Sequence, residues 1–423
     1  MTRAELHENL MVAFDTLRMN KLRSSLTILG IVIGVTSVIS VAAIIQGLNR
    51  YVQQKVESLG SRTYFITRFP AGTFAFDSLP EHIRQRKYFQ YSDARAVAGW
   101  APSVSFVTVF GTRMAIPGMA GSGTNEINYG GQRVEKVILR GTEPEFISAF
   151  PMFAIGQGRY ITRADDEHAR AVIVLGASIA GALFGSVDPL GKQVRLNGKL
   201  YEVIGVLLPE AGMFGGPGPD DFALIPMGDF HKRYPEAREL VLAFTVPPDI
   251  SVGVAQDQVV QALRRIRKVP PHAENDFELT SPDFLSSMWN QLTGALVILT
   301  FLISSVGLLV GGVGVMNIML ISVTERTSEI GLRKAIGARR SDIRAQFLME
   351  AITLTLAGGT IGIVFGIGIA LLVRWLIPSI PAAISVLWVA LGVSISVGVG
   401  LFFGYYPANR AANLDPIVCL RYE

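Results

Sequence analysis

Residues 322–343 read SVTERTSEIGLRKAIGARRSDI, and they form a charged run between two long apolar blocks. No Asp, Glu, Lys or Arg occurs from residue 290 to 324 or from residue 351 to 373. A membrane-crossing helix needs about 20 predominantly apolar residues, because the hydrocarbon core of a bilayer is about 30 Å thick. Both blocks meet that length, so the charged run is expected to connect two membrane spans.

Two further segments, residues 26–45 and 385–406, are also long and apolar enough to cross a membrane. Half of the 423 residues are hydrophobic and 17% are charged, a composition typical of membrane proteins. The sequence therefore predicts an α-helical membrane protein with four transmembrane helices and a mixed α+β extracytoplasmic domain inserted between helices 1 and 2. The spans are expected at residues 26–46, 289–323, 347–376 and 385–406. A cleaved signal peptide is the disfavoured alternative for the first span, because its apolar run is too long.

Lys and Arg residues beside the spans predict the orientation of the chain. The basic residues lie ahead of the first span, between the second and third, and after the fourth: Arg18, Lys21, Arg23, Arg326, Arg333, Lys334, Arg339, Arg340, Arg344, Arg410 and Arg421. Both termini and residues 324–346 are therefore expected in the cytoplasm. Residues 47–288 and the uncharged link 377–384 are expected on the outer side. Residues 1–25 have the pattern of an amphipathic helix, and residues 407–423 form a cytoplasmic tail.

The inserted segment 47–288 mixes short apolar runs with Gly, Pro and Asp turn signals. Strands are expected at residues 63–69, 137–142, 171–176, 193–198, 199–208, 221–227, 240–246 and 276–282. A helix is expected at residues 254–268, and another continues the first span to Gly60. The glycine-rich stretches 117–132 and 210–221 are interpreted as loops. Cys419 is the only cysteine, so the domain is expected to be stable without an intramolecular disulfide.

No motif in the sequence predicts a catalytic, cofactor-binding or metal site. GSVDPLGKQ, residues 185–193, superficially resembles a phosphate-binding loop, but it has one residue too many between its glycines and Gln193 where a Ser or Thr would hold magnesium. A turn before a pair of strands explains it better. The histidines are scattered without ligand spacing, and the spans hold no charge that would serve ion or proton transport.

Small residues recur at close spacing within the spans. Such spacing lets helix backbones approach each other in lipid, where packing drives helix association. The glycines expected to serve transmembrane packing are Gly30, Gly34, Gly311, Gly312, Gly358, Gly362, Gly366, Gly400 and Gly404. They are interpreted either as contacts within one bundle or as marks of an interface between subunits.

Four stretches of the sequence carry a family resemblance. NIMLISVTERTSEIGLRKAIGARRSDIRAQFLMEA (residues 317–351) is closely similar to the signature of MacB/FtsX-type ABC transporter permeases. NKLRSSLTILGIVIGVTSVI (20–39), DPLGKQVRLNGKLYEVIGVL (188–207) and FGYYPANRAANLDPIVCLRYE (403–423) agree with it. The matches lie at both ends and in the middle, so the resemblance covers essentially the whole chain.

The resemblance implies a non-catalytic permease subunit of the bacterial inner membrane with a periplasmic core domain. It pairs with a second permease subunit, as a homodimer or a heterodimer, and is driven by an ABC ATPase that uses ATP and Mg. MacB proteins carry the ATPase ahead of the first span. This sequence has about 25 residues there and no Walker A motif, so the ATPase is expected on a separate chain. The expected function is mechanotransmission: export or extraction of an amphiphilic cargo such as a macrolide, peptide, lipopeptide or lipoprotein.

The charged run is then expected to dock the ATPase. Residues 324–336 are predicted to continue the second span as a helix that Gly337 ends, and Ser341 is predicted to cap the next helix. The ATPase-coupling residues are Glu325, Arg326, Glu329, Ile330, Leu332, Arg333, Lys334 and Ile336. The apolar members would enter a groove on the ATPase while the charged ones set the register. The alternative is a basic loop held against anionic lipid.

Further partners and a different role are also considered. The resemblance allows a periplasmic adaptor and a TolC-like outer-membrane duct, and nucleic acid is not expected as a partner. FtsX-like members signal to cell-wall hydrolases in the periplasm without transporting anything, so a transmembrane signalling subunit is the second reading of the chain.

Overall fold

The computed structural model describes residues 21–58, 60, 62–73, 79–115, 122–212, 216–377 and 381–420, with side chains for all of these except 21–26 and 420. Most of the amphipathic helix predicted for residues 1–25 lies outside the described residues, as does part of the predicted link 377–384. The chain divides into two compact units. Residues up to Tyr51 and from Trp289 onward form one, called here the helical unit, and Val52–Met288 form the other, called the sheet unit.

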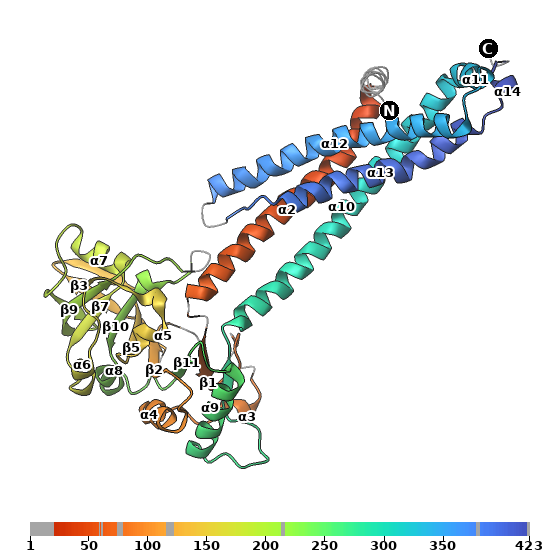
Figure 1. The fold of residues 1–423 in the computed structure, drawn as a ribbon. Coiled ribbons are helices and arrows are strands. Elements are labelled where there is room, and N and C mark those ends of the chain that lie inside the picture. Colours follow the sequence, from red (N-terminus) through yellow and green to blue (C-terminus); the bar gives the residue numbers. More distant parts are fainter. Residues whose placement is uncertain are drawn as a thin grey trace. The chain divides into compact units, whose positions relative to one another are not determined.

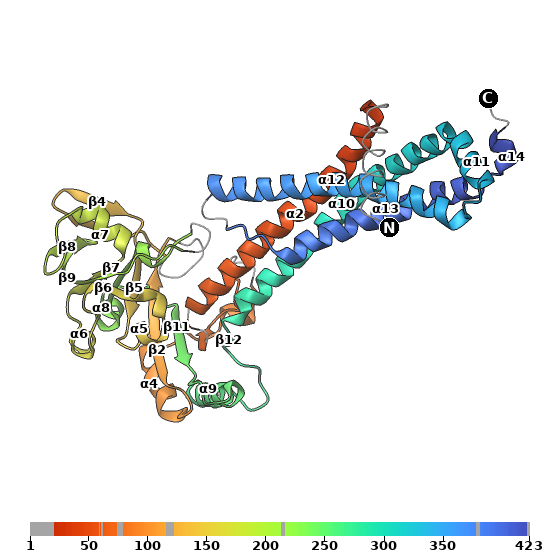
Figure 2. The same ribbon diagram turned by 45° about the horizontal axis from the view of Figure 1, so that its top comes forward.

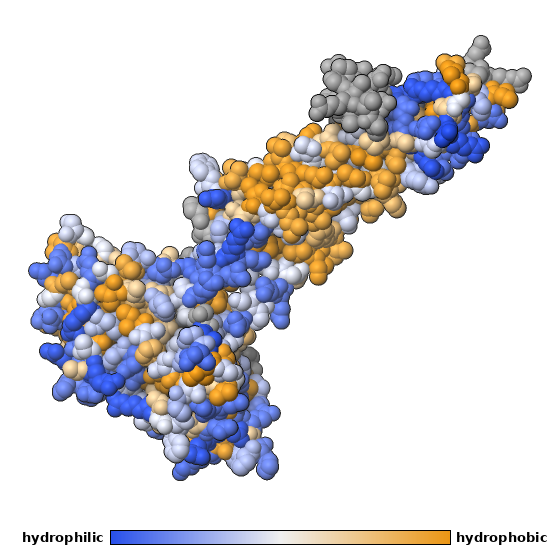
Figure 3. Space-filling model, viewed as in Figure 1, coloured by the Kyte–Doolittle hydropathy of each residue, from blue (hydrophilic) through white to orange (hydrophobic). Residues whose placement is uncertain are grey.

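Long apolar helices build the helical unit (Figures 1 and 2). They are α2 (Lys21–Ser58), α10 (Asp283–Glu325), α12 (Arg340–Leu376) and α13 (Val386–Ala412), with short α11 (Thr327–Ala335) and α14 (Pro416–Leu420). Each of the four long helices contains a window that is apolar enough to cross a membrane. Hydrophobic side chains accordingly cover the middle of the long helices in Figure 3, as expected for helices that face lipid, while hydrophilic side chains predominate at the end of this unit near α11 and α14.

Helix α2 lies at the centre of the helical unit and packs against α10 and α12 through glycines. A Cβ atom added at Gly30 would stand 3.0 Å from the Cα of Gly311 in α10. On α12, a Cβ at Gly362 would stand 2.9 Å from the Cβ of Val35, and one at Gly366 would stand 2.8 Å from that of Ile39. Backbones approach this closely only where a side chain is absent, so the glycines determine the spacing of these helices.

The sheet unit is built on a mixed β-sheet. In the described residues its strands are β1 (Thr63–Thr67), β2 (Phe106–Arg113), β3 (Glu126–Tyr129), β4 (Gln132–Glu135), β5 (Ile138–Thr142), β6 (Ile155–Gly158), β7 (Val172–Leu175), β8 (Gln193–Leu196), β9 (Lys199–Leu207), β10 (Phe222–Pro226), β11 (Leu240–Thr245) and β12 (Glu278–Thr280). The strand order is β12-β1-β11-β2-β5-β10-β7-β9-β8-β3-β4, and β6 pairs with β9. The pairs β5–β10 and β7–β9 are parallel, and the other pairs are antiparallel.

Helices cover this sheet. They are α3 (Glu81–Arg84), α4 (Tyr91–Trp100), α5 (Phe146–Ala149), η2 (Pro151–Phe153), α6 (Arg163–Glu167), α7 (Ala177–Phe184), η4 (Pro219–Asp221), α8 (Met227–Arg233) and α9 (Val252–Ile266). Together with the four span-length helices, this insertion of a mixed domain between the first and second spans confirms the predicted fold class.

In the central strands of the sheet both faces are buried, and successive side chains point to opposite faces. On β2, Val109 belongs to the core that includes residues of α4, α7, α8 and α9, and its neighbour Phe110 belongs to a second core that includes α5 and η2. Leu139 and Ile138 of β5 divide between the two cores in the same way. The sheet unit therefore has two hydrophobic cores, one on each face of the sheet.

The interpretation of residues 117–132 as a loop is wrong at their C-terminal end. Strands β3 and β4 form an antiparallel hairpin there, with Tyr129 paired to Gln132. Gly130 (φ 54°) and Gly131 (φ 87°) make the two-residue turn. Both φ values are positive, and Gly-Gly is a sequence that such hairpin turns favour, so the signal was present in the sequence.

Candidate functional site

The connector between α10 and α12, residues 326–339, holds the charged run with which the sequence analysis began. Helix α10 ends at Glu325, and α11 begins at Thr327. Arg326 between them has φ −104° and ψ 20°, outside the helical range. The prediction that one helix continues from residue 324 to 336 is therefore wrong, because the backbone bends at Arg326 and starts a separate short helix.

Hydrogen bonds to the last turn of α11 fix its C-terminal end. The Gly337 N–H donates to the Lys334 carbonyl at 3.1 Å, and the Ala338 N–H donates to the Arg333 carbonyl at 3.1 Å. The bond from Ala338 to Arg333 spans six residues and requires a positive φ at Gly337. Gly337 has φ 107°, a value that glycine adopts without strain. The prediction that Gly337 ends the helix is confirmed.

Helix α12 begins at Arg340, with Arg339 rather than Ser341 in the capping position. The Asp342 carboxylate, at the third position of the helix, accepts the Arg339 N–H at 3.1 Å, which is the reciprocal bond of a capping box. The prediction for Ser341 is wrong because the capping position lies two residues earlier in the chain. The Ser341 hydroxyl instead donates to the Asp342 carboxylate at 3.2 Å.

One side of α11 is anchored to the rest of the helical unit. Ile330 is fully buried in the core of this unit, together with Ile343 and Ala411. The Lys334 Nζ donates to the carbonyl oxygens of Ala412 at 2.6 Å and Leu414 at 2.7 Å, just where α13 ends. Burial lowers the pKa of Lys334, and the nearby Arg340 lowers it further. Ile330 and Lys334 therefore hold α11 in place. Ile330 was predicted to enter a groove on the ATPase, but its side chain is buried and is not available to a partner.

Ion pairs join the connector to α12 and within α11. Arg326 lies 3.4 Å from the carboxylate of Glu350, which is buried in α12. Arg333 pairs with Glu329 one turn earlier and donates to the Gln346 side chain of α12 at 3.1 Å. With Lys334, all three basic residues predicted to contact the ATPase thus have partners inside the same chain.

The opposite side of α11 is exposed. Leu332 is 54% exposed and Ile336 is 79% exposed, and Glu325 and Glu329 are also exposed. Glu329, Leu332 and Ile336 follow each other at spacings of three and four residues, which places them on one helical face. We call these three residues the exposed face of α11. Short α14 packs on the same connector, and its Ile417 and Val418 are 71% and 58% exposed.

All nine glycines predicted for transmembrane packing face another helix of the same unit. Gly30, Gly34 and Gly311 lie between α2 and α10, while Gly358, Gly362 and Gly366 lie between α12 and α2. Gly312 faces Phe403 of α13, Gly400 faces Thr355 of α12, and Gly404 faces Ala351 of α12. The structure thus brings these residues together inside one bundle.

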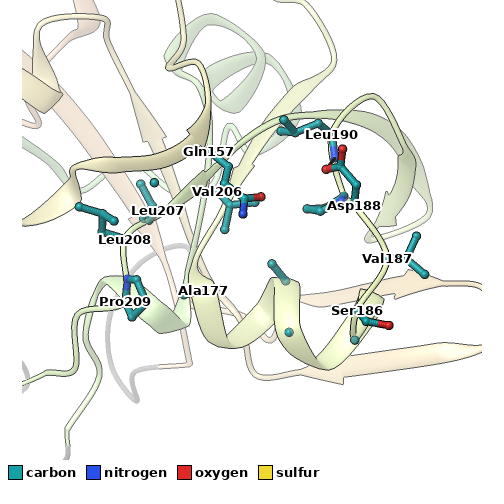
Figure 4. A pocket seen from close by; sticks show the side chains of 15 residues that line it. Gln157, Ala177, Ser186, Val187, Asp188, Leu190, Val206, Leu207, Leu208 and Pro209 are labelled. Carbon is teal, nitrogen blue, oxygen red and sulfur yellow. Dashed lines mark hydrogen bonds between the residues drawn. The ribbon is translucent and has the colours of Figure 1, made fainter.

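A cavity of about 700 Å³ in the sheet unit borders the GSVDPLGKQ stretch (Figure 4). It is lined by residues 185–190, by α7 and by the end of β9. Asp188 is the only charged residue in this lining, and its carboxylate accepts the Leu190 N–H at 3.1 Å in a local turn. The described residues of the lining include no cation that would attract a phosphate. Among the described residues, no cluster of three His, Cys, Asp or Glu side chains could hold a metal ion.

Family comparisons agree with the two units. Residues 24–266 match the MacB-like periplasmic core domain, and residues 301–416 match the FtsX-like permease C-terminal domain. The first match covers more than half of the chain and includes α2 and most of the sheet unit. The second match includes α11, α12 and α13.

Curated relatives match over nearly the whole chain. The macrolide export ATP-binding/permease protein MacB of Bdellovibrio bacteriovorus is 32% identical over 428 residues, which cover 99% of this chain and 62% of the relative. The pyoverdine export ATP-binding/permease protein PvdT of Pseudomonas syringae pv. syringae is 30% identical over 431 residues, which cover 99% of this chain and 60% of the relative. This chain therefore spans about three fifths of the length of these relatives.

A solved structure is also similar in part. The periplasmic region of MacB from Actinobacillus actinomycetemcomitans aligns with a TM-score of 0.44 at 18% identity and covers 56% of this chain and 97% of that one. The two family matches, the curated relatives and the four span-length helices lead to one conclusion. The chain belongs to the MacB/FtsX-type ABC transporter permeases and is a multi-pass membrane protein of that family.

Proposed function

We propose that this chain is the permease subunit of an ABC-type exporter and that a separate ATPase subunit docks on the exposed face of α11. Movement of the ATPase during its ATP cycle is then transmitted to the permease, which exports or extracts an amphiphilic cargo. The observation that supports this best is the two-sided environment of α11. Ile330 and Lys334 anchor one side of it, while Leu332 and Ile336 are left exposed on the other.

A docking helix that transmits force needs both features. An apolar helix face gains binding energy when it enters a groove on a partner. The anchored side keeps the helix from rotating freely when the partner moves. A basic loop held against lipid explains the arginines of this region but gives no reason for an exposed Ile336 between them.

The Lys and Arg residues beside the spans support a cytoplasmic location for this docking face, where ATP is available, and an outer location for the sheet unit at a bacterial inner membrane. A second copy of the chain or a related permease would complete the transporter. The relatives that match 99% of the chain carry export names. This favours export over signalling to a cell-wall hydrolase, and those names give a macrolide and pyoverdine as the exported molecules of the relatives.

Capture of the partner from native membranes tests the docking proposal. The full-length chain with a C-terminal tag is purified in mild detergent, and bound ABC ATPase is identified by mass spectrometry and by vanadate-sensitive ATP hydrolysis. Leu332→Glu and Ile336→Glu are expected to lose the ATPase, because each puts a charge into an apolar contact. Arg333→Glu is a poorer choice, because Arg333 also holds Glu329 and Gln346.

Val187→Glu is the matched control, since Val187 is a 54% exposed apolar residue of the sheet unit. It should retain the ATPase at the level of the native chain. Equal ATPase recovery from all four proteins would show that the exposed face of α11 is not the docking site.

A further inference from the structure

A second cavity of the sheet unit, of about 490 Å³, lies against strands β1, β11, β2 and β5. Its volume is within the range of roughly 300 to 1,000 Å³ that small-molecule sites occupy. The side chains that give it its apolar character are Phe65, Phe69, Met114, Val241, Phe284 and Leu285. These side chains are partly exposed, although Phe65, Met114 and Val241 also pack against the second core, so an apolar surface is open inside the cavity.

The cavity also has charged residues, and two of them neutralise each other. The Arg68 guanidinium binds both carboxylate oxygens of Glu239, and its Nε lies 3.1 Å from Oε2. Among the described residues that line the cavity, Glu239 is the only acidic one. Arg140, the remaining ionisable residue there, therefore leaves the lining with one excess positive charge.

Arg140 reaches the cavity because of its register in the sheet. It is the cross-strand partner of Thr112, and its Nε donates to the Thr112 hydroxyl at 3.1 Å. Its guanidinium carbon lies 4.3 Å from the ring centroid of Phe222 and 4.8 Å from that of Phe110. Phe153 and Phe146 are 5.5 and 5.7 Å away. The cation thus stands between a cluster of aromatic rings and the open cavity.

The terminal nitrogens of Arg140 make no hydrogen bond or ion pair with the residues that the structure describes. An enclosed charge without a partner is costly, and aromatic rings compensate for only a part of the lost hydration. Burial lowers the pKa of Arg140, yet a guanidinium remains a cation at neutral pH. An anion that entered the cavity would supply the missing partner in a surrounding that strengthens the attraction.

We propose that this cavity binds a small anionic amphiphile, with a carboxylate or phosphate head on the Arg140 guanidinium and an apolar body against Phe65, Val241 and Phe284. Head and body are recognised by adjacent parts of one site, the cation by charge and the apolar lining by burial. The inference goes beyond the proposed function, because binding here requires neither ATP nor an ATPase subunit. A negative result for ATPase docking on α11 therefore does not affect the test of ligand binding in this cavity, and the reverse also holds.

The test uses the full-length chain in amphipol and a decanoate analogue that carries a diazirine in its chain. Illumination is expected to label peptides that contain residues 65–73, 241 or 281–285. Excess decanoate or decyl phosphate is expected to compete, and the more effective of the two identifies a carboxylate or a phosphate as the preferred head. Decanol, which has the same chain without the charge, is expected to compete at least about tenfold less well.

Two variants leave the cavity without an unpaired Arg140 cation, each in a different way. Arg140→Gln deletes the charge, and Thr112→Glu places a carboxylate beside it in the cross-strand position. Both are expected to weaken competition by decanoate roughly tenfold to a hundredfold, the range for loss of a charge-assisted hydrogen bond. Thr112→Glu keeps the arginine among its aromatic rings and satisfies it, so its result remains interpretable if Arg140→Gln does not fold.

Arg195→Gln is the matched control, since Arg195 is an exposed arginine on β8 and does not line this cavity. Labelling of this variant by the probe, and competition by decanoate, should equal those of the native chain. Labelling confined to other peptides would overturn the site. Competition by decanol equal to that by decanoate, or unchanged competition in a folded Thr112→Glu variant, would overturn the role of Arg140.

Discussion

Gly331 of α11 lies directly against Cys419 of α14, and a Cβ atom added to Gly331 would stand 2.6 Å from the Cβ of Cys419. Cys419 is only 1% exposed as a result. The C-terminal helix α14 thus closes over the connector at a position where no larger residue fits. Because Cys419 is the only cysteine in the chain, its reactivity reports on this contact alone.

Gly331→Leu should therefore expose Cys419. Overpacking of a well-filled contact costs about 1–3 kcal/mol, which raises the open population roughly tenfold or more. The rate of maleimide labelling of Cys419, followed by intact mass, should rise by that factor. Ser328→Leu on the exposed side of α11 is the control and should leave the rate unchanged. An unaltered rate in Gly331→Leu would contradict the packing of α14 on α11.

The pair formed by Arg326 and buried Glu350 predicts an asymmetric mutational effect. Arg326→Met leaves a carboxylate buried without this cation, and we expect a loss of about 1–3 kcal/mol in stability. Glu350→Gln in the same chain should restore part of that loss, because the buried group is then neutral. Thermal unfolding in detergent, followed by intrinsic fluorescence, gives the midpoints of the native, single and double variants. A double variant less stable than Arg326→Met would argue against the pair.

Two glycines of α12 offer a matched comparison of helix packing. A Cβ at Gly362 would meet Val35 of α2, whereas one at Gly368 would meet nothing within 4 Å. Gly362→Leu should therefore separate α2 from α12 and lower the unfolding midpoint, with a penalty of about 1–3 kcal/mol. Gly368→Leu should leave that midpoint unchanged. If Gly368→Leu instead changes the oligomeric state in detergent, that glycine marks a contact between subunits.

Glu143 predicts a pH dependence of the sheet unit. Burial raises the pKa of this carboxyl to about 7, against the lowering effect of the Val109 N–H that donates to it at 2.8 Å. A raised pKa in the folded state means that stability is full below the ordinary value of 4.5 and is lost as the pH rises through 7. The expected loss between these limits is about 3 kcal/mol.

Hydrogen exchange of β2 peptides in the full-length chain, corrected for intrinsic rates, measures this effect. Glu143→Gln keeps an oxygen for the Val109 N–H but cannot ionise, so its protection should vary little between pH 5 and pH 8. Glu135→Gln is the control and should retain the native pH dependence, because the Glu135 side chain is 63% exposed and pairs with exposed Arg133 on the same strand. A native slope that persists in Glu143→Gln would assign the pH dependence to another group.

Much of the architecture follows from the sequence because it depends on length and polarity along the chain. A charge-free block of span length has few alternatives to a membrane helix, as residues 351–373 illustrate. The strands at 137–142, 171–176 and 240–246 are short apolar runs bounded by turn residues, and all three are strands in the structure. The family signature at 317–351 is likewise local, and the family matches agree with it.

The features that concern the candidate sites depend on contacts between distant segments. Ile330 has the same character in the sequence as Leu332 and Ile336, and only the packing of α12 and α13 against α11 buries the first and leaves the other two exposed. Arg140 reads as an ordinary residue within an apolar strand. It becomes a candidate ligand-binding group because Phe110 and Phe222, more than 100 residues apart, meet beside it.

The sequence by itself thus determined the four span-length helices, the inserted domain and the family, since hydrophobic length and local motifs are properties of contiguous residues. Only the tertiary structure decided which face of α11 is free, which glycine contacts which helix, and where a cation remains without an anion. Those properties arise when segments far apart in the chain exclude water from each other, and burial of that kind has no signature in a single segment.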